Sequence, residues 1–553
     1  MPHPSVFVKR WLIFVHRWLG VALSIIFLMW FVSGIVMMYW SFPSIDASDR
    51  LQRAPALDAK RITVSPEQAF AALSGDQRSG QVRLTTFDGR PVYRFGGGEG
   101  RGGGGGRGGG AAMVYADDGT VHQHVDAAMI DRAAVAWTGR PLTEATKQAV
   151  GEVDQWTVGG LRTVRPLFKY SWPDGQQVYV NGNTAEVAQY TTTASRFWAY
   201  LGAIPHWLYF TPLRKHQPEW FSVVVWSSLI GTVAPLMGIV IIIWMYSPGK
   251  RYRHAGAPTS IPYRGWKRWH AIAGLFFGLV TATWAFSGLL SMGPFPIMNR
   301  LTDLILPAPP EAAGGGGGRG PGGPPGVAKA LGGGALPLSA YAERSPRDAI
   351  AAVQGFDVKE LEFTSFAGEP LYLATNGRGG TRLIPLHGDP MTTLDPEDVL
   401  RTVRNTVGSN LADLRVMDEY DAYYRDRRRE RPLPVIYARV NDAVGSRYYI
   451  DPKTANIVGQ YNARGWVNRW LYHGLHSLDF PWLYKYRPLW DVVVISLMLG
   501  GTALCVTSLV LTWRVLARKI AVIFHAQLNQ PDDDLVLEHD GGVSVSFQAP
   551  PEV

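Results

Sequence analysis

Four long apolar runs without a charged residue constrain the fold of this 553-residue chain more than any other feature. A helix needs roughly 20 apolar residues to cross a bilayer, and each run reaches that length. The first run is too long for the roughly 7–15-residue core of a signal peptide and lacks a small-residue cleavage pattern. We therefore expect an integral membrane protein with four transmembrane α-helices. The runs are Leu19–Ile45, Phe221–Gly249, Trp269–Asn299 and Val492–Trp513.

Basic residues at the ends of these runs predict how the chain is oriented. Lys and Arg concentrate on the cytoplasmic flanks of membrane helices. Here basic residues without acidic neighbours occupy the N-terminal tail, the loop between the second and third runs, and the segment after the fourth. Both chain ends are therefore expected in the cytoplasm and both long polar regions outside it. This pattern largely accounts for the net charge of +9, so no nucleic-acid partner is required.

The runs and the polar regions between them predict the segment boundaries. Cytoplasmic segments are expected at 1–10, 248–265 and 515–553. The spans are expected at 11–42, 220–247, 266–298 and 490–514. Outer domains are expected at 46–195 and 336–465, each followed by an interfacial helix, at 196–219 and 466–489, and a Gly/Pro-rich linker at 300–335.

Both outer domains are predicted to be α+β. Ser65 and Ser345 each precede a proline and a run of helix-forming residues, as N-cap residues do. Val82–Phe87 and Pro91–Phe95 alternate around an Asp-Gly pair, which favours a β-hairpin. Two glycine-rich tracts, Gly96–Gly110 and Gly314–Gly326, cannot bury a core and are expected to be flexible connections. The remaining predicted strands are Ala112–Tyr115, Leu167–Trp172, Gln177–Val180, Leu361–Phe366, Leu371–Thr375, Val435–Val440 and Arg447–Ile450.

The two halves of the chain repeat one another in register. Residues 254 positions apart match around the first and third runs, and residues 270 positions apart match around the second and fourth. Since each half contains two spans, both halves enter the membrane in the same direction. This predicts a parallel tandem repeat of helix, outer domain and helix. The matched pairs include His16 and His270, Gly20 and Gly274, Ser33 and Ser287, His206 and His476, and Gly231 and Gly501.

Four of the thirteen histidines occupy matched positions. His16 and His270 lie at the inner ends of the first and third spans, and His206 and His476 lie just before the second and fourth. Ionisable groups at membrane depth are costly unless they bind something. A two-fold axis would bring each pair face to face, which suits two six-coordinate haems b, one on each side of the membrane. Covalent haem attachment is excluded, because Cys505 is the single cysteine.

Small residues and one further histidine belong to the same candidate site. Gly20 and Gly274 lie one helical turn from the inner histidines and would leave room for a flat macrocycle. His473 precedes His476 by three residues and has no counterpart in the first half. His473 is therefore expected either to support the edge of the outer haem or to replace His206 as a ligand.

Other interpretations of these histidines stay open at this point. A single histidine near a span end is more often an interfacial or hydrogen-bonded core residue than a ligand. His473 and His476 would share one helix face and suit zinc, but tetrahedral zinc needs further ligands and Asp479 is the one carboxylate nearby. His122 and His124 alternate on a predicted strand and are candidate substrate contacts. The other histidines are expected at the surface.

These residues resemble the PepSY-associated transmembrane family. That family combines four membrane helices with periplasmic PepSY domains in Gram-negative inner membranes, and its members include periplasmic ferrisiderophore reductases that carry haem b. The resemblance implies that His16, His206, His270 and His476 are axial haem ligands. The motifs that carry it are HRWLG at His16–Gly20, WHxxxG at Trp269–Gly274, the Ser-Gly pairs at 33–34 and 287–288, Leu475-His476, and the Ser-Pro helix starts at Ser65 and Ser345.

The sequence therefore predicts a di-haem b oxidoreductase that moves electrons from a cytoplasmic or quinol donor to a periplasmic acceptor. The resemblance implies a ferric siderophore as that acceptor, and we expect it to be held between the outer domains. No catalytic acid or base is assigned, because one-electron transfer needs none. A separate donor is implied, since no glycine tract lies between a strand and a helix as a dinucleotide site requires. Two alternatives stay open: a non-enzymatic membrane protein whose PepSY domains bind a peptide, protease or regulator, and a transporter.

Overall fold

Four helices that are long and apolar enough to cross a membrane form the framework of the protein. The computed structural model describes residues 4–73, 81–96, 112–293, 327, 330–331, 336–426 and 429–528. Four-span membrane architecture with sheet-containing α+β domains is confirmed. The four helices are α1 (Pro4–Met37), α8 (Gln217–Met245), α9 (Gly265–Ser291) and α16 (Leu489–Leu528).

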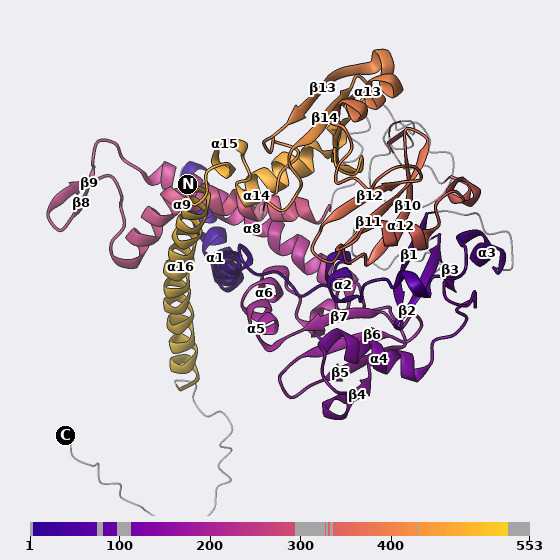
Figure 1. Cartoon of the computed structure of the whole chain (residues 1–553). Coiled ribbons are helices and arrows are strands. Elements are labelled where there is room, and N and C mark those ends of the chain that lie inside the picture. Colours follow the sequence, from indigo (N-terminus) through magenta and orange to yellow (C-terminus); the bar gives the residue numbers. More distant parts are fainter. Residues whose placement is uncertain are drawn as a thin grey trace, which may run out of the picture.

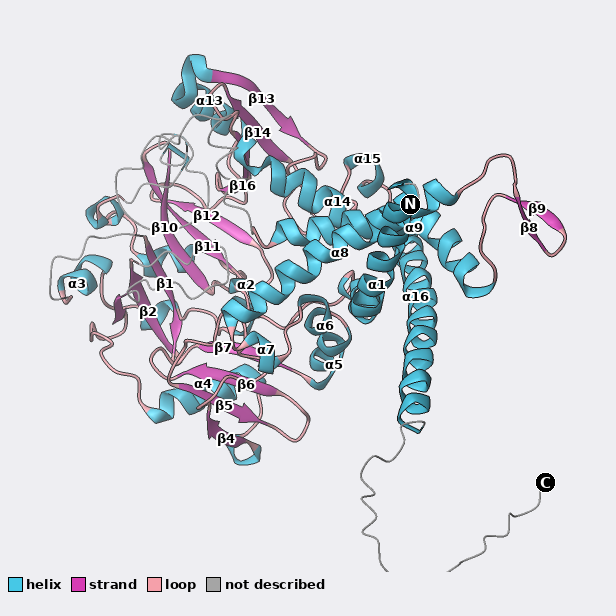
Figure 2. Ribbon diagram, turned by 180° about the vertical axis from the view of Figure 1, so that it is seen from behind, coloured by secondary structure: helices cyan, strands magenta, loops and turns pink. Residues whose placement is uncertain are grey.

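The membrane helices place the large polar regions on one side. Helix α9 packs along α8 and α16, and α1 packs along α16 and α8. All the larger sheets lie beyond one end of α8 and α9, whereas the short hairpin of β8 (Tyr252–His254) and β9 (Ala257–Thr259) lies beyond the other end (Figure 1). The view from behind shows the same arrangement (Figure 2). This is the layout that a parallel repeat predicts.

Two predicted spans end at the wrong residue. Helix α1 stops at Met37 instead of 42, because the Ser-Phe-Pro-Ser stretch that follows does not favour helix. Helix α9 stops at Ser291 instead of 298, just before Gly293, whose φ of +57° takes the chain out of the helix. Residues 294–298 lie outside the described part of the chain.

The last helix is longer than predicted. Helix α16 continues to Leu528, through the first part of the segment 515–553 that we expected to be a tail. Arg514 ends the apolar run, but Arg, Lys and Ala are good helix formers, so the helix continues past it through Arg518 and Lys519. The predicted tail 1–10 is likewise helical from Pro4.

The first polar region folds into two α+β units. The first unit combines one short helix with a three-stranded meander, and the second combines one longer helix with a four-stranded meander. A short helix and a 3₁₀ turn precede the first unit, and a second 3₁₀ turn (Leu142–Glu144) precedes β4. The elements are α2 (Ala47–Arg53), the turn Ala59–Arg61, α3 (Pro66–Ala71), β1 (Val82–Phe87), β2 (Arg90–Phe95), β3 (Ala112–Tyr115), α4 (Ala127–Thr138), β4 (Thr146–Ala149), β5 (Leu167–Ser171), β6 (Gln177–Asn181) and β7 (Val187–Thr191).

The second polar region repeats this plan. A helix and three strands form its first unit, and a helix and four strands form its second. The predicted helix start at Asp395 is confirmed, since its side chain caps the second helix. The elements are the 3₁₀ turn Leu338–Tyr341, α12 (Pro346–Ala352), β10 (Glu360–Phe366), β11 (Glu369–Thr375), β12 (Thr381–Pro385), α13 (Pro396–Val407), the 3₁₀ turn Gly408–Asn410, β13 (Leu411–Met417), β14 (Val435–Val440), β15 (Arg447–Ile450), β16 (Ile457–Tyr461) and the 3₁₀ turn Ala463–Gly465.

The two halves share a single six-stranded sheet of order β12-β11-β10-β1-β2-β3. Antiparallel pairing of β1 with β10 joins them, with Arg83 opposite Glu362 and Leu84 opposite Leu361. Hydrogen-bonded strands lie about 4.8 Å apart, which leaves no room for a ligand between them. No ligand fits between these two strands, and the expectation that a ligand is held elsewhere between the outer domains stays a prediction.

Both faces of the shared sheet are buried. One face packs against α3 and α12 in a core that includes Leu84 and Leu361. On the other face, Val92 packs against the α4 unit and Leu373 against the α13 unit. Because successive side chains of a strand point to opposite faces, the same strands supply both cores. The four units are therefore held together as one body of packed apolar side chains.

Most short-range predictions in the outer domains are confirmed. Strands β1 and β2 form the expected hairpin around Asp88 and Gly89, both at positive φ. Ser65 caps α3 with a complete capping box, and Ser345 caps α12. Most of the tract Gly96–Gly110, the whole of Gly314–Gly326, and most of the predicted linker 300–335 lie outside the described residues.

The strand predicted for His122 and His124 is wrong. Val121 forms one isolated bridge to Val114, and the chain then runs in an irregular loop to Asp126, the N-cap of α4. The alternation of His122 and His124 is therefore that of an extended loop.

Neither interfacial region is the single helix that we expected. Leu208 and Leu478, which are 270 residues apart, adopt left-handed φ values of 53° and 48° and end the helix just after each outer histidine. The elements are α5 (Thr193–Leu201), α6 (Ala203–Trp207) and α7 (Thr211–Arg214) in the first half, and the π-helix Val467–Gly474, α14 (Leu475–Ser477) and α15 (Pro481–Tyr484) in the second.

Candidate functional site

The inner histidines lie next to one another between the membrane helices. The ring centres of His16, in α1, and His270, in α9, are 6.2 Å apart. His16 Nδ1 lies 2.9 Å from the carbonyl oxygen of Ala234 in α8. His270 Nδ1 lies 3.1 Å from Thr507 Oγ1 in α16. All four membrane helices therefore contribute to the inner pair.

The outer histidines form a second pair with matching contacts. The ring centres of His206, in α6, and His476, in α14, are 6.0 Å apart. His206 Nδ1 lies 3.1 Å from Ser33 Oγ and 3.2 Å from the carbonyl oxygen of Trp30. His476 Nδ1 lies 3.0 Å from Ser287 Oγ. Since the two serines are matched residues of the repeat, the two-fold relation extends to the groups that hold the rings.

The hydrogen bonds assign the same tautomer to all four histidines. A carbonyl oxygen only accepts, so Nδ1 donates to Ala234 in one case and to Trp30 in another. The hydroxyls of Ser33, Ser287 and Thr507 donate to carbonyls three residues earlier, at 3.3, 3.0 and 2.7 Å, so their oxygens accept from Nδ1. The lone pair of each imidazole therefore lies on Nε2. Metal-binding histidines are commonly oriented in this way by a bond from the second nitrogen.

The separation of the rings fits one metal ion between each pair. A metal–imidazole bond is about 2 Å long, so two axial imidazoles place their ring centres roughly 6 Å apart. The observed 6.2 and 6.0 Å agree with this value. Tetrahedral zinc is a poorer fit: in the described part of the chain, no group of three or more His, Cys, Asp or Glu side chains is placed to hold a metal ion.

Glycines allow the close approach of neighbouring helices to the rings. A Cβ atom on Gly238, in α8, would lie 2.8 Å from His16 Cε1, closer than such atoms approach in proteins. Cβ atoms on Gly34 and Gly288 would lie 3.5 and 3.7 Å from the outer histidine rings. Gly238 was not predicted from the sequence. Its matched residue in the repeat is Ser508, so a comparison of the two halves does not single it out.

Gly20 and Gly274 lie where α1 and α9 approach α16. Cβ atoms there would lie 3.5 Å from Ser508 Oγ and 3.9 Å from Leu504 Cδ1, which are ordinary contacts. Space for a small group therefore exists beside both glycines. Their expected place next to a macrocycle stays a prediction.

His473 is linked to the outer pair through an aromatic ring. The ring of Tyr472 lies 4.7 Å from that of His473 and 5.3 Å from that of His476. Asp479, the carboxylate of the zinc alternative, is 1% exposed and forms an ion pair with Arg425. The roles expected for His473, support of the haem edge or replacement of His206, stay predictions.

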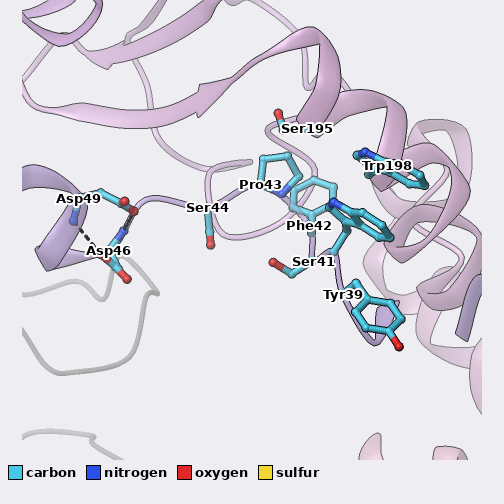
Figure 3. A pocket seen from close by; sticks show the side chains of 10 residues that line it. Tyr39, Ser41, Phe42, Pro43, Ser44, Asp46, Asp49, Ser195 and Trp198 are labelled. Carbon is cyan, nitrogen blue, oxygen red and sulfur yellow. Dashed lines mark hydrogen bonds between the residues drawn. The ribbon is translucent and has the colours of Figure 1, made fainter. Parts of the chain in front are cut away.

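An open cavity of about 370 Å³ lies where α1 leaves the helix bundle. Trp198, in α5, lines its wall (Figure 3) and stacks on Trp40, with ring centres 3.8 Å apart. Two carboxylates at the start of α2, Asp46 and Asp49, lie at its rim, where they form a capping box. Helix α5 leads through Gly202 into α6, so the cavity lies close in the chain to His206. The remaining lining residues are Tyr39, Ser41, Phe42, Pro43, Ser44 and Ser195.

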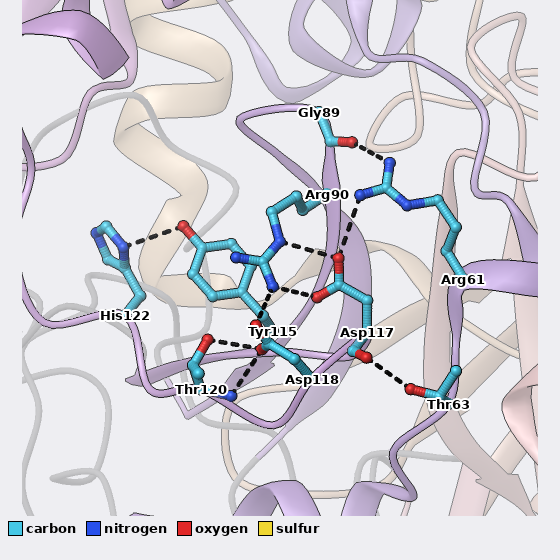
Figure 4. A network of polar contacts seen from close by, with 9 residues as sticks. All are labelled: Arg61, Thr63, Gly89, Arg90, Tyr115, Asp117, Asp118, Thr120 and His122. Carbon is cyan, nitrogen blue, oxygen red and sulfur yellow. Dashed lines mark hydrogen bonds and ion pairs between the residues drawn. The ribbon is translucent and has the colours of Figure 1, made fainter.

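His122 belongs to a polar network on the outer domain (Figure 4). Its Nδ1 lies 3.3 Å from the hydroxyl oxygen of Tyr115. The guanidinium of Arg90 stacks 3.9 Å above the Tyr115 ring and forms ion pairs with Asp117 and Asp118. This network ties the turn after β3 to β2. The expectation that His122 and His124 contact a substrate stays a prediction.

Asp117 makes this network sensitive to acid. Its carboxylate accepts from Arg90 and, at 3.1 Å, from Arg61, and the hydrogen bond from Arg90 is the main cause that holds its pKa below the ordinary 3.8. A pKa that is lower in the folded than in the unfolded state stabilises the fold above about pH 4, and this stabilisation is lost as the pH falls through the folded-state pKa. We expect Asp117→Asn to reduce the drop in melting temperature between pH 6 and pH 3. An unchanged drop would contradict this assignment.

A family model described as PepSY-associated TM region matches residues 13–387, which include both inner histidines and His206. No curated protein matches the chain. The matched range covers α1 from Ile13 onward, all of α8 and α9, and the shared sheet, and it ends before His476.

Proposed function

The chain belongs to the PepSY-associated TM region family, and on that premise we propose that it is a di-haem b oxidoreductase of the bacterial inner membrane. In the proposed orientation, the chain ends and the β8–β9 hairpin face the cytoplasm and the sheets face the periplasm. The exposed side chains of Lys250 and Arg251 beside this hairpin, and of Arg253 within it, support the orientation, because cytoplasmic loops are rich in basic residues.

Four histidines would hold the two haems. His16 and His270 would bind the inner one and His206 and His476 the outer one, each through Nε2. When bound, the haems would supply two one-electron carriers, one toward each side of the membrane. The hydrogen bonds from Nδ1 fix the tautomer and the direction of each ring, and they raise the basicity of Nε2.

The proposed acceptor is a ferric siderophore in the periplasm, with a cytoplasmic or quinol donor. One electron would convert Fe(III) to Fe(II), which most siderophores hold less tightly. The cavity between α1 and α5 is the candidate docking place, because its aromatic wall leads through Gly202 to the helix that carries His206. The place expected between the outer domains stays a second candidate.

The observation that carries this proposal is the pairing itself. Two histidine pairs, matched in the repeat, share one tautomer and a ring separation of 6.0–6.2 Å. The test is the absorption spectrum of protein purified from a haem-replete host. We expect a reducible b-type spectrum with about two haems per chain, one for each histidine pair. A colourless preparation from such a host would exclude the electron-transfer function.

The serines that hold the outer rings are expected to tune the bound group. Ser33→Ala and Ser287→Ala remove a hydroxyl that accepts from Nδ1, at 3.1 and 3.0 Å. Loss of such an outer-shell partner typically costs 10–100-fold in metal affinity or activity. We expect both variants to shift the midpoint potential of the outer haem and to leave that of the inner haem unchanged, as measured by redox titration of the absorption spectrum. Ser24→Ala, in the same helix as Ser33 and away from the histidines, is the matched control. Equal shifts in all three variants would contradict the assignment.

A further inference from the structure

A buried arginine at the end of the helix bundle that faces the sheets has no anionic partner among the described residues. Arg214, the last residue of α7, is 7% exposed. Its Nε and Nη1 atoms are buried without a hydrogen-bond partner, and no carboxylate of the described residues pairs with it. Burying a cation costs several kcal/mol unless a counter-charge and hydrogen bonds compensate. A buried guanidinium with unused donors therefore indicates a ligand that carries negative charge.

Two aromatic rings build the walls of this site. The guanidinium carbon of Arg214 lies 4.2 Å from the ring centre of Trp220 and 4.8 Å from that of Tyr209. Trp220 Nε1 donates to the carbonyl oxygen of Trp207 at 2.9 Å, which fixes the ring. Stacking on ring faces leaves the N–H groups, which lie in the guanidinium plane, as donors to an oxyanion.

A second arginine also stacks against two aromatic rings, but it has a hydrogen-bond partner. The guanidinium of Arg53 lies 4.8 Å from the ring centre of Trp137 and 5.0 Å from that of Tyr190. It also donates to the carbonyl oxygen of Trp137 at 2.7 Å. Stacking therefore does not require a guanidinium to leave its donors unused. In the second half, the residue matched to Arg214 is Tyr484, so this cation is particular to the first half.

The position of Arg214 identifies the source of the anion. Helix α7 packs against α8, which begins three residues after Arg214. Aromatic side chains such as Trp220 occupy the membrane–water interface, and lipid headgroups lie at that level. Guanidinium groups bind phosphate with two parallel hydrogen bonds. We propose that Arg214, stacked against Tyr209 and Trp220, binds the phosphate of an anionic membrane phospholipid.

The test measures whether an anionic lipid stabilises the protein through Arg214. Protein in neutral detergent is melted with increasing phosphatidylglycerol, with phosphatidylcholine, or with inorganic phosphate. We expect phosphatidylglycerol to raise the melting temperature of the wild type. A hydrogen bond to a charged group contributes about 1.5–3 kcal/mol. Arg214→Met is therefore expected to raise the half-stabilising lipid concentration roughly 10–100-fold, and Arg214→Lys to raise it less.

The matched variant Arg53→Met separates lipid binding from stacking. It removes a cation that stacks against two rings, as Arg214→Met does, but we expect its response to phosphatidylglycerol to equal that of the wild type. Because the readout is the lipid concentration, a lower melting temperature without lipid does not obscure it. Equal responses of the wild type and Arg214→Met to phosphatidylglycerol would overturn the proposal. Stabilisation by inorganic phosphate as strong as that by the lipid would overturn the lipid source.

Discussion

His270→Ala and His206→Ala are each expected to remove one haem and to halve the haem content of the purified protein. Each histidine supplies one side of a pair whose ring centres are 6.2 or 6.0 Å apart, so its loss leaves the other ring without an opposed ligand. Electron delivery should then fall by more than the roughly 10–100-fold that loss of an outer-shell partner costs. The measurements are haem per chain by absorbance and acceptor reduction with a chemical donor.

His473→Ala is the control for these variants. Its ring contacts Tyr472, which lies against His476, and it has no matched histidine in the first half. We expect this variant to keep both haems. The opposite result, in which His473→Ala loses the outer haem and His206→Ala keeps it, would transfer the ligand role from His206 to His473.

Gly238→Ala is expected to disrupt the inner pair although it adds one methyl group. The added Cβ would lie 2.8 Å from His16 Cε1 and 3.3 Å from Nε2, so the ring must move from its place opposite His270. Overpacking of this kind typically costs 1–3 kcal/mol, whereas alanine in place of glycine otherwise stabilises a helix by up to about 1 kcal/mol. The expected result is loss or a large spectral shift of the inner haem, with the outer haem retained.

Gly20→Ala separates movement of the His16 ring from loss of space for the macrocycle. It makes the same chemical change as Gly238→Ala one turn from His16, but its Cβ would meet Ser508 Oγ at 3.5 Å, an ordinary contact. Because Gly20 is expected to leave room for the macrocycle, a change of the inner haem in this variant would report that space and not a displaced ring. The absorption spectrum of each variant shows whether the inner haem is retained, and the melting temperature shows whether the fold is destabilised. If Gly238→Ala binds the inner haem as the wild type does, the ring of His16 is not held against α8 as described.

Much of this architecture follows from the sequence because it depends on local or repeated signals. Apolar length predicts the four spans, and the register of the repeat predicts which histidines meet. The capping residues and the Asp-Gly turn act within a few residues of themselves. Each of these features can be predicted from the residues that form it, without knowledge of contacts between distant parts of the chain.

Other features depend on contacts that no local pattern encodes. Strands β1 and β10 are far apart in the chain, and each alternates like many edge strands, so nothing marks them as partners. Gly238 has no matched glycine. Its importance lies in its contact with the ring of His16, which belongs to another helix. The left-handed Leu208 and Leu478 break regions that read as continuous helices, although leucine favours helix.

The shared sheet has a consequence for how the protein is made. Strand β1 is translated long before β10, so its edge stays unpaired while two further membrane helices are made. An unpaired edge is a template for wrong pairing, and contacts distant in the chain form slowly. The outer part of the first half is thus an incomplete folding intermediate until the second half arrives. Splitting the chain between α8 and α9 would yield two fragments that must find each other before either outer region is finished.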